Sequence, residues 1–291
     1  DACQIGLIPL RFKSEHEFTD IFGRLWDVQY NEGNFFPFYR TGQITSKEKW
    51  EKWSKPDPKD YVKVAKEFYK NILKELKGEE IVTMVTNDFA GVFESTWQGM
   101  GLPFFSKMLV FEPNFIKEVA ELYTDFTIQV NDAFMDVGAR IFVESGDIAY
   151  KQNPMINPKK FEQIFQPCYR RITDAVHSRN GLSILHTDGF VEPFLDMAVG
   201  AGFDGLHSLE PTAGVDLGRV KKKVGDKLCL LGNIDVAHVL AKGTREEVEK
   251  DVKRAIRQAG FGGGYIVSAT NMHPGVQVQN LKWMVEATHK Y

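Results

Sequence analysis

The chain has 291 residues, 43% of them hydrophobic, which is enough for one large buried core or two ordinary ones. Its 36 basic and 39 acidic residues leave a formal charge of -3, which excludes a field strong enough to hold nucleic acid or an anionic membrane. Cys3, Cys168 and Cys229 stand far apart, so a cysteine-rich zinc knuckle is excluded, and no apolar run approaches the roughly 18 residues of a membrane span. We therefore expect a cytoplasmic protein with free thiols and no nucleic-acid or membrane partner.

The first part of the chain is predicted to be extended and irregular. Residues 5–12 look like a strand, and residues 26–39, which combine aromatic residues with glycine and proline, favour a hairpin or an irregular excursion. Residues 46–58 are rich in lysine, glutamate and tryptophan and favour a solvated connection. An amphipathic helix is predicted over residues 60–76, where apolar positions recur at helical spacing.

From residue 81 onward, predicted strands alternate with predicted helices. The strands are expected at 81–86, 139–144, 182–186, 203–209, 227–231 and 265–268. The helices are expected at 93–100, 113–137, 158–178, 191–201, 217–223, 244–259 and 277–289. This alternation favours a (β/α)8 barrel with an N-terminal excursion over an open doubly wound sheet. We expect residues 1–80 to pack on a barrel body of residues 81–291, in one structural domain overall.

Polar side chains gather where the predicted strands end. In α/β folds the carboxyl ends of parallel strands form the face on which ligands bind, so polar groups at these positions suggest chemistry. The candidate residues are Asp88, Asp147, Tyr150, His186, Asp188, His207, Glu210, Asn233, Asn271 and His273. If the barrel is correct, these residues converge on one mouth.

Several of these residues also have a purely structural explanation. His186 by itself is as often a hydrogen-bonded structural histidine as a ligand. Asp188 can cap the helix that follows it, and Asn233 and Asp235 suit a turn or a helix cap. Glutamate is less usual in turns than aspartate or asparagine, which slightly favours a functional role for Glu210.

Six segments of the chain share a pattern with a known superfamily. They are Gly146-Asp147-Ile148-Ala149-Tyr150, His186-Thr187-Asp188-Gly189, Glu210-Pro211 followed by Gly214-Val215-Asp216-Leu217, Gly232-Asn233-Ile234-Asp235, Gly243-Thr244 with Glu247-Val248, and Gly262-Gly263-Gly264-Tyr265-Ile266. In these segments the chain resembles the uroporphyrinogen decarboxylase superfamily, which includes corrinoid-linked methyltransferases. The resemblance runs from about residue 91 to the last residue and implies a (β/α)8 barrel with a deep cleft at the carboxyl ends of its strands.

The decarboxylase branch of this superfamily carries an Arg-Gln-Ala-Gly-Arg-Tyr segment near the N-terminus. Its arginines hold the carboxylates of the porphyrinogen substrate by bidentate pairing. The first 50 residues of this chain contain three arginines, Arg11, Arg24 and Arg40, and no similar segment. In this respect the given sequence departs from the pattern of that branch, and decarboxylation stays open.

The methyltransferase branch binds zinc through His-x-Cys and a second cysteine after the last strand. Here the histidine matches as His186, Asp188 replaces the first cysteine, and the second position falls at or beside Thr270-Asn271. Soft thiolates suit a site that activates a thiol, whereas a histidine and carboxylate set makes a harder site. Such a site is better suited to polarising an ether oxygen.

We therefore hypothesise a corrinoid-protein-dependent methyltransferase that demethylates a small methoxylated or methylated compound, with zinc as the candidate metal. The predicted metal ligands are His186, Asp188 and Glu210; the predicted catalytic residues are Asp188, Asp147, Tyr150 and Asp88; the predicted substrate contacts are Asn233, His207, His273 and Asn271. The resemblance implies a corrinoid cofactor on a separate binding protein and leaves a homodimer open.

Two alternatives stay open at this point. In a metal-free decarboxylase, Asp88, Asp147 or Asp188 would stabilise a protonated ring nitrogen of a porphyrinogen-like substrate, and Tyr150 would assist. In a non-catalytic barrel subunit, the loss of both cysteines would reflect lost activity. So many acids and imidazoles at one rim favour an enzyme.

Overall fold

The computed structural model describes residues 2–6, 10–31, 34–86 and 91–291. The predicted catalytic residue Asp88 lies outside the described residues. Within the described ranges, no helix is long and apolar enough to cross a membrane.

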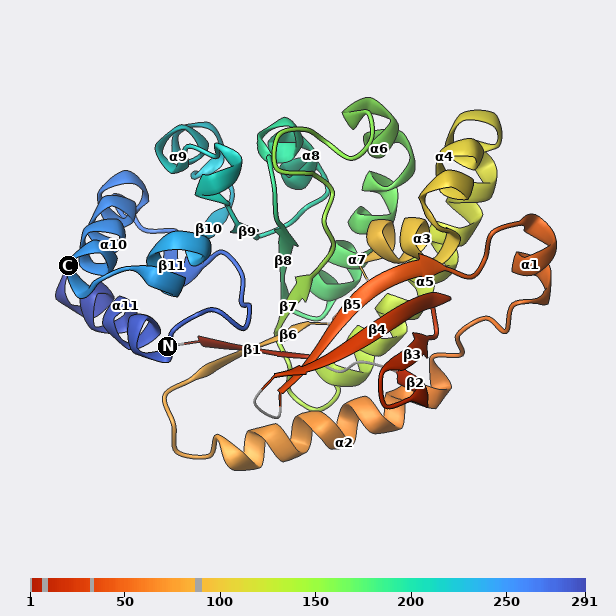
Figure 1. Ribbon diagram of the computed structural model, residues 1–291, viewed down its shortest axis with the longest axis horizontal. Helices are drawn as coiled ribbons and strands as arrows, with labels where there is room; N and C mark the ends of the chain where they lie inside the picture. Colours follow the sequence, from red (N-terminus) through yellow and green to blue (C-terminus); the bar gives the residue numbers. More distant parts are fainter. Residues whose placement is uncertain (1, 7–9, 32–33, 87–90) are drawn as a thin grey trace. The chain divides into compact units, whose positions relative to one another are not determined.

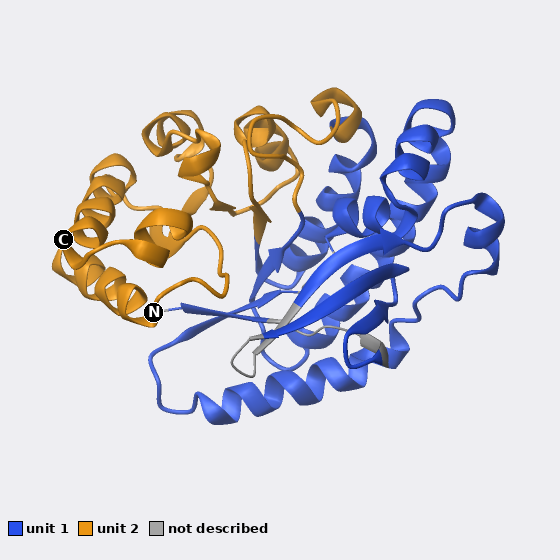
Figure 2. Cartoon of the chain, in the orientation of Figure 1, with its two compact units in different colours: residues 1–146, 162–183 blue, residues 147–161, 184–291 orange. Residues whose placement is uncertain are grey.

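The chain forms two compact units (Figure 2). Unit 1 holds residues 1–146 and 162–183, and unit 2 holds residues 147–161 and 184–291. Each unit contributes parallel strands with helices between them, and each is described by itself below.

Unit 1 combines parallel and antiparallel strands (Figure 1). Its parallel strands, in the order β1-β6-β7, are β1 (Ala2–Gly6), β6 (Val82–Thr86) and β7 (Ile141–Glu144). Its antiparallel sheet, in the order β2-β3-β4-β5, consists of β2 (Leu10–Ser14), β3 (Glu17–Asp20), β4 (Arg24–Asn31) and β5 (Asn34–Gly42). The β4–β5 pair confirms the hairpin predicted over residues 26–39.

The helices of unit 1 are α1 (Lys47–Lys52), α2 (Lys59–Glu75), α3 (Val92–Met100), α4 (Leu102–Phe111), α5 (Pro113–Met135) and α7 (Gln166–Ser178). α1 lies inside the segment predicted as a solvated connection. The prediction missed it because this short helix depends on a cap and a tertiary contact: Ser46 accepts a hydrogen bond from the Lys49 N–H, and Trp50 is buried.

The single helix predicted over residues 158–178 is two helices, α6 (Pro158–Ile164) and α7, with Phe165 between them. Pro167 lies in the first turn of α7. Proline has no N–H to donate to the carbonyl four residues earlier, so it is tolerated at the start of a helix but not in its interior. The break therefore follows from one residue whose effect the periodic pattern did not include.

Unit 2 is a regular alternation of strands and helices (Figure 1). Its strands, in the order β8-β9-β10-β11, are β8 (Leu182–Thr187), β9 (Gly205–Ser208), β10 (Cys229–Ile234) and β11 (Tyr265–Ala269), and every pairing is parallel. Its helical segments are η1 (Glu192–Phe194), α8 (Leu195–Gly200), η2 (Pro211–Ala213), α9 (Leu217–Val224), η3 (Val236–Leu240), α10 (Arg245–Ala259) and α11 (Val278–Lys290). The first two residues of β8 belong to unit 1.

The helices of unit 2 begin and pack as their sequences dictate. Thr244 and Glu247 form a capping box that starts α10, and Asp216 caps α9. Val248 and Val252 on α10 are fully buried, as is Leu230 on β10, so the apolar face of the helix covers the sheet. The α/β class and the predicted (β/α)8 barrel type are confirmed, and parallel pairing brings the carboxyl ends of β8–β11 to one side of unit 2.

Candidate active site at the ends of β8 and β9

Asp147, His186 and Asp188 form a cluster that we call the carboxylate–histidine cluster. One ligand atom from each residue lies within 4.8 Å of the others, and all three side chains are partly buried. The two-residue period of a strand places His186 and Asp188 on the same face at the end of β8. Thr187 points to the opposite face, where its hydroxyl accepts a hydrogen bond from the Ile148 N–H at 3.1 Å and so holds the neighbouring Asp147 segment.

Asp188 is held by donors from two other segments of unit 2. The Ser208 hydroxyl donates to Asp188 Oδ1 at 2.6 Å, and the Asn271 amide donates to Asp188 Oδ2. Hydrogen bonds to both carboxylate oxygens restrict the rotation of the side chain. The carboxylate is therefore oriented before any ligand arrives.

Asp147 lies against Asp188. Its Oδ1 accepts a hydrogen bond from the Asp188 N–H at 2.8 Å. Burial, the nearby Asp188 carboxylate and, to a smaller extent, Glu210 raise the pKa of Asp147 to about 7, although the Asp188 N–H opposes this shift. Two carboxylates in one partly buried place cannot both stay ionised at low cost, so the pair favours a proton or a cation between them.

His186 meets a second histidine across the β8–β9 pair. Parallel register places His186 opposite His207, and their Nδ1 atoms lie 2.6 Å apart. His207 Nε2 lies 3.0 Å from the main-chain oxygen of Ala269. Burial and the neighbouring His186 lower the pKa of His207 to about 4, so this imidazole is neutral at neutral pH.

Glu210 lies near the cluster and contacts Gly189 and Thr212. Its Oε2 accepts a hydrogen bond from the Gly189 N–H at 3.0 Å, and its Oε1 accepts one from the Thr212 hydroxyl. A Cβ on Gly189 would lie 2.6 Å from two carbonyl oxygens, so only glycine allows this close approach. The group of candidate ligand atoms contains Asp147 and not Glu210, and the ligand role predicted for Glu210 stays a prediction.

Residues 25–291 match the family described as uroporphyrinogen decarboxylase (URO-D). The chain belongs to the uroporphyrinogen decarboxylase family. This membership confirms the resemblance seen in the sequence and agrees with the α/β barrel described above.

Two relatives of this URO-D family member carry different names. The chain is 26% identical to "Methylcobamide:CoM methyltransferase MtaA" of Methanosarcina barkeri, across 64% of this chain and 52% of that protein. It is 25% identical to "Uroporphyrinogen decarboxylase" of Pseudoalteromonas atlantica, across 100% of this chain and 82% of that protein. The chain thus spans about half the length of the methyltransferase relative.

A solved structure supports the fold of this URO-D family member. A methyltransferase from Methanosarcina mazei superimposes with a TM-score of 0.70 at 18% sequence identity, covering 91% of this chain and 75% of that chain. At this identity the likeness shows the shared fold.

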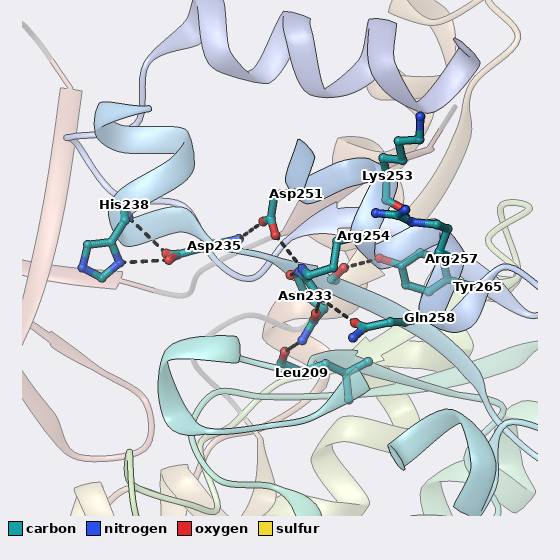
Figure 3. Close-up of polar contacts among 11 residues, drawn as sticks. Leu209, Asn233, Asp235, His238, Asp251, Lys253, Arg254, Arg257, Gln258 and Tyr265 are labelled. Carbon is teal, nitrogen blue, oxygen red and sulfur yellow. Dashed lines mark hydrogen bonds and ion pairs between the residues drawn. The ribbon is translucent and has the colours of Figure 1, made fainter. Parts of the chain in front are cut away.

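The remaining predicted residues lie in other surroundings. Asn271 contacts Asp188, as described, whereas the side chains of Tyr150 and His273 are exposed. Asn233 is fully buried at the end of β10, in the network of Figure 3. Its amide nitrogen donates to the Leu209 carbonyl at 2.5 Å, which uses one end of the amide for structure.

Arg254 of α10 occupies the other end of the Asn233 amide (Figure 3). Its guanidinium donates to Asn233 Oδ1 at 2.7 Å and to the Asn233 main-chain oxygen at 2.8 Å. Asp235 forms the helix cap that the sequence suggested. Its Oδ1 accepts hydrogen bonds from the Ala237 and His238 N–H groups at the start of η3.

Ser208 is the residue of this site that the sequence prediction missed. It is fully buried and follows His207 at the end of β9, opposite Thr187 of β8. A serine beside a histidine at a strand end is a weak signal by itself. Only the strand register shows that its hydroxyl reaches Asp188.

The carboxylate–histidine cluster fits a divalent cation. It offers one imidazole nitrogen and two carboxylates, which are hard donors of the kind that Zn²⁺ accepts in catalytic sites. The hydrogen bonds from Ser208 and Asn271 to Asp188 supply the outer support that metal-binding carboxylates usually have.

Proposed function

We propose that this chain takes a methyl group from a small methoxylated or methylated compound and passes it to a corrinoid carried by a partner protein. The observation that carries the proposal is the carboxylate–histidine cluster, in which an oxygen ligand, Asp188, stands where the resemblance expects a soft thiolate. The similarity to a methylcobamide-dependent relative supports a corrinoid partner. The hard donors support an oxygen-linked methyl group over a thiol.

The proposed reaction requires the leaving oxygen of the methoxy group to be protonated. The methyl–oxygen bond breaks, the methyl group goes to the corrinoid, and the oxygen leaves as an alcohol or phenol after it takes a proton. An unprotonated alkoxide is a poor leaving group, so an acid beside the oxygen lowers the barrier. Asp147 suits this role, because its raised pKa of about 7 leaves a proton on a substantial fraction of the molecules near neutral pH.

Neighbouring groups prepare Asp147 for proton transfer. Hydrogen bonds from Ser208 and Asn271 hold the Asp188 carboxylate in place, and its closeness helps to raise the pKa of Asp147. A divalent metal, if bound, would be held by His186, Asp188 and an unprotonated Asp147, and it would polarise the leaving oxygen in place of the acid.

The second candidate is decarboxylation of a porphyrinogen-like substrate. It is favoured by the relative named uroporphyrinogen decarboxylase, whose similarity extends over the whole chain. Two of the three arginines in the first 50 residues make it less favourable, because binding a substrate carboxylate would compete with the side-chain partners that they already have. Arg24 is buried and donates to Asp20 and Gln98, and Arg40 donates to Asp27 and Glu17.

The test supplies the purified protein with a reduced corrinoid protein and a panel of methoxylated compounds. We expect methyl transfer from at least one compound, and a loss of about 100-fold or more in Asp147→Asn. Asp196→Asn is the matched control, since Asp196 is exposed and pairs with Lys223. Porphyrinogen turnover without demethylation of any compound would reject the proposal in favour of decarboxylation.

A further inference from the structure

Two histidines form a hydrogen-bonded chain that ends on a main-chain carbonyl. His186 Nδ1 and His207 Nδ1 are 2.6 Å apart, and the ring centroids are 4.9 Å apart with an interplanar angle of 30°. The rings therefore meet end to end through these nitrogens and are not stacked. The other nitrogen of His207 lies 3.0 Å from the Ala269 oxygen at the end of β11.

The carbonyl sets the direction of this chain. A carbonyl oxygen can only accept, so Nε2 of His207 must carry a hydrogen and donate it. A neutral imidazole has one N–H, so Nδ1 of His207 has a lone pair and accepts. The hydrogen between the two rings then belongs to Nδ1 of His186, and Nε2 of His186 is left with a lone pair.

We propose that His207 is a positioning residue that fixes the ring orientation and tautomer of His186, so that His186 presents Nε2 as an electron-pair donor to the carboxylate–histidine cluster. Because Nδ1 is committed to His207, Nε2 is the ring nitrogen left for a cation beside Asp147 and Asp188. The use of Nε2 in the reaction rests on the proposed function. The tautomer itself does not, because it can be measured without any reaction.

The positioning matters because His186 could otherwise present the wrong nitrogen. Torsion about the bond to an imidazole ring is broad, and an unsupported ring can place N–H or a lone pair toward the cluster. A nitrogen that carries a hydrogen cannot bind a metal or accept a proton. The second hydrogen bond, to Ala269, keeps the His207 ring itself from turning.

Two amide substitutions at position 207 separate the two ends of this chain. In His207→Asn, an amide oxygen can take the place of Nδ1 and still accept from His186. In His207→Gln, the longer side chain places its amide near the former Nε2, so it can still donate to Ala269 but no longer supports His186. Both variants remove the ring, so a packing effect changes both alike.

The first measurement is nitrogen NMR of the histidine rings in the metal-free protein. We expect the proton of His186 on Nδ1 in the parent protein and in His207→Asn, and a mixture of tautomers in His207→Gln. A proton on Nε2 of His186 in the parent protein, or an unchanged tautomer in His207→Gln, overturns the proposal. The parent spectrum decides by itself if a variant fails to fold.

The second measurement is the affinity for Zn²⁺ alone. We expect roughly 10–100-fold weaker binding in His207→Gln and nearly parental binding in His207→Asn. Equal losses in both variants would assign His207 to packing and overturn the proposal. If the parent protein shows the expected tautomer but transfers no methyl group, the proposed function fails and the positioning role stands.

Discussion

The ends of β8 and β10 carry similar polar residues, but their hydrogen bonds differ. At the end of β8, His186 uses Nδ1 for His207 and lies in one cluster with two carboxylates. At the end of β10, the Asn233 amide donates to Leu209 and accepts from Arg254, and Arg254 also donates to the main-chain oxygen (Figure 3). Both ends of the Asn233 amide therefore hold contacts within the fold, whereas the polar groups at the end of β8 gather beside one another.

The helix that follows β10 explains this difference. Arg254 comes from α10, and besides its two bonds to Asn233 it donates to Asp251 at 2.7 Å and to Gln258 at 2.7 Å. The guanidinium thereby ties the end of β10 to its own helix. Tyr265 of β11 adds a hydrogen bond to the Gly232 carbonyl at 2.8 Å. The polar groups at the end of β10 thus stabilise the packing of β10 against α10 and β11, and the end of β8 is the candidate for catalysis.

The β8 end should respond in activity. Asp147→Asn keeps the size of the side chain but removes the acid, so kcat for demethylation should fall by roughly 100-fold to 10,000-fold, the usual contribution of a general acid. The fold should survive, because ionising Asp147 costs free energy in the native state at pH 8. Steady-state kinetics and urea unfolding at pH 8 measure both effects. Full activity in this variant would remove Asp147 from the mechanism.

The β10 end should respond in stability. Asn233→Ala leaves the Leu209 carbonyl and part of Arg254 without partners, and residue 233 has a φ of 65°, which suits asparagine better than alanine. The free energy of unfolding should fall by roughly 2–4 kcal/mol. Zn²⁺ affinity should stay near the parental value. A large loss of Zn²⁺ affinity in a folded variant would place Asn233 in the site after all.

A third strand end, that of β7, carries a buried carboxyl group, Glu144. It shows how burial of such a group makes the free energy of unfolding depend on pH. Glu144 is fully buried, and burial raises its pKa to about 7 although Asn131 donates to it at 3.0 Å. In the unfolded chain this pKa is near the ordinary 4.5. Folding therefore binds a proton between pH 4.5 and about 7, and stability falls as the pH rises through that window.

Glu144→Gln should remove this pH dependence. At pH 8 the variant should be more stable than the parent protein by up to roughly 3 kcal/mol, whereas at pH 4 the difference should be small. Urea unfolding at the two pH values measures it. A parental protein equally stable at pH 5 and pH 8, after correction with this variant, would show that Glu144 is solvated.

The smallest change is expected at Tyr265. Tyr265→Phe removes one hydroxyl, which donates to the Gly232 carbonyl, so stability should fall by about 1 kcal/mol. Metal binding and activity should be unchanged, because the hydroxyl contacts β10 and not the carboxylate–histidine cluster. Thermal unfolding measures the first effect. Lost activity without lost stability would contradict the separation of the two strand ends.

Much of the fold could be predicted because its signals are local. The strand–helix alternation from residue 81 onward, the helix caps at Asp216 and Thr244 and the hairpin near the N-terminus all follow from patterns within short windows. The elements that were missed or merged, α1 and the α6–α7 break, depend on a tertiary contact of Trp50 and on Pro167. Both effects lie outside hydrophobic periodicity.

The sequence by itself determined the fold class and the pairing of His186 with Asp188 on one strand face, since both depend on periods of a few residues. Only the tertiary structure decided which polar groups keep free lone pairs. Arg254 reaches Asn233 from 21 residues away, and Asn271 reaches Asp188 from 83 residues away. Hydrogen-bond partners at such distances follow from strand register and helix packing, so no local pattern reveals that one strand end is occupied and the other is available.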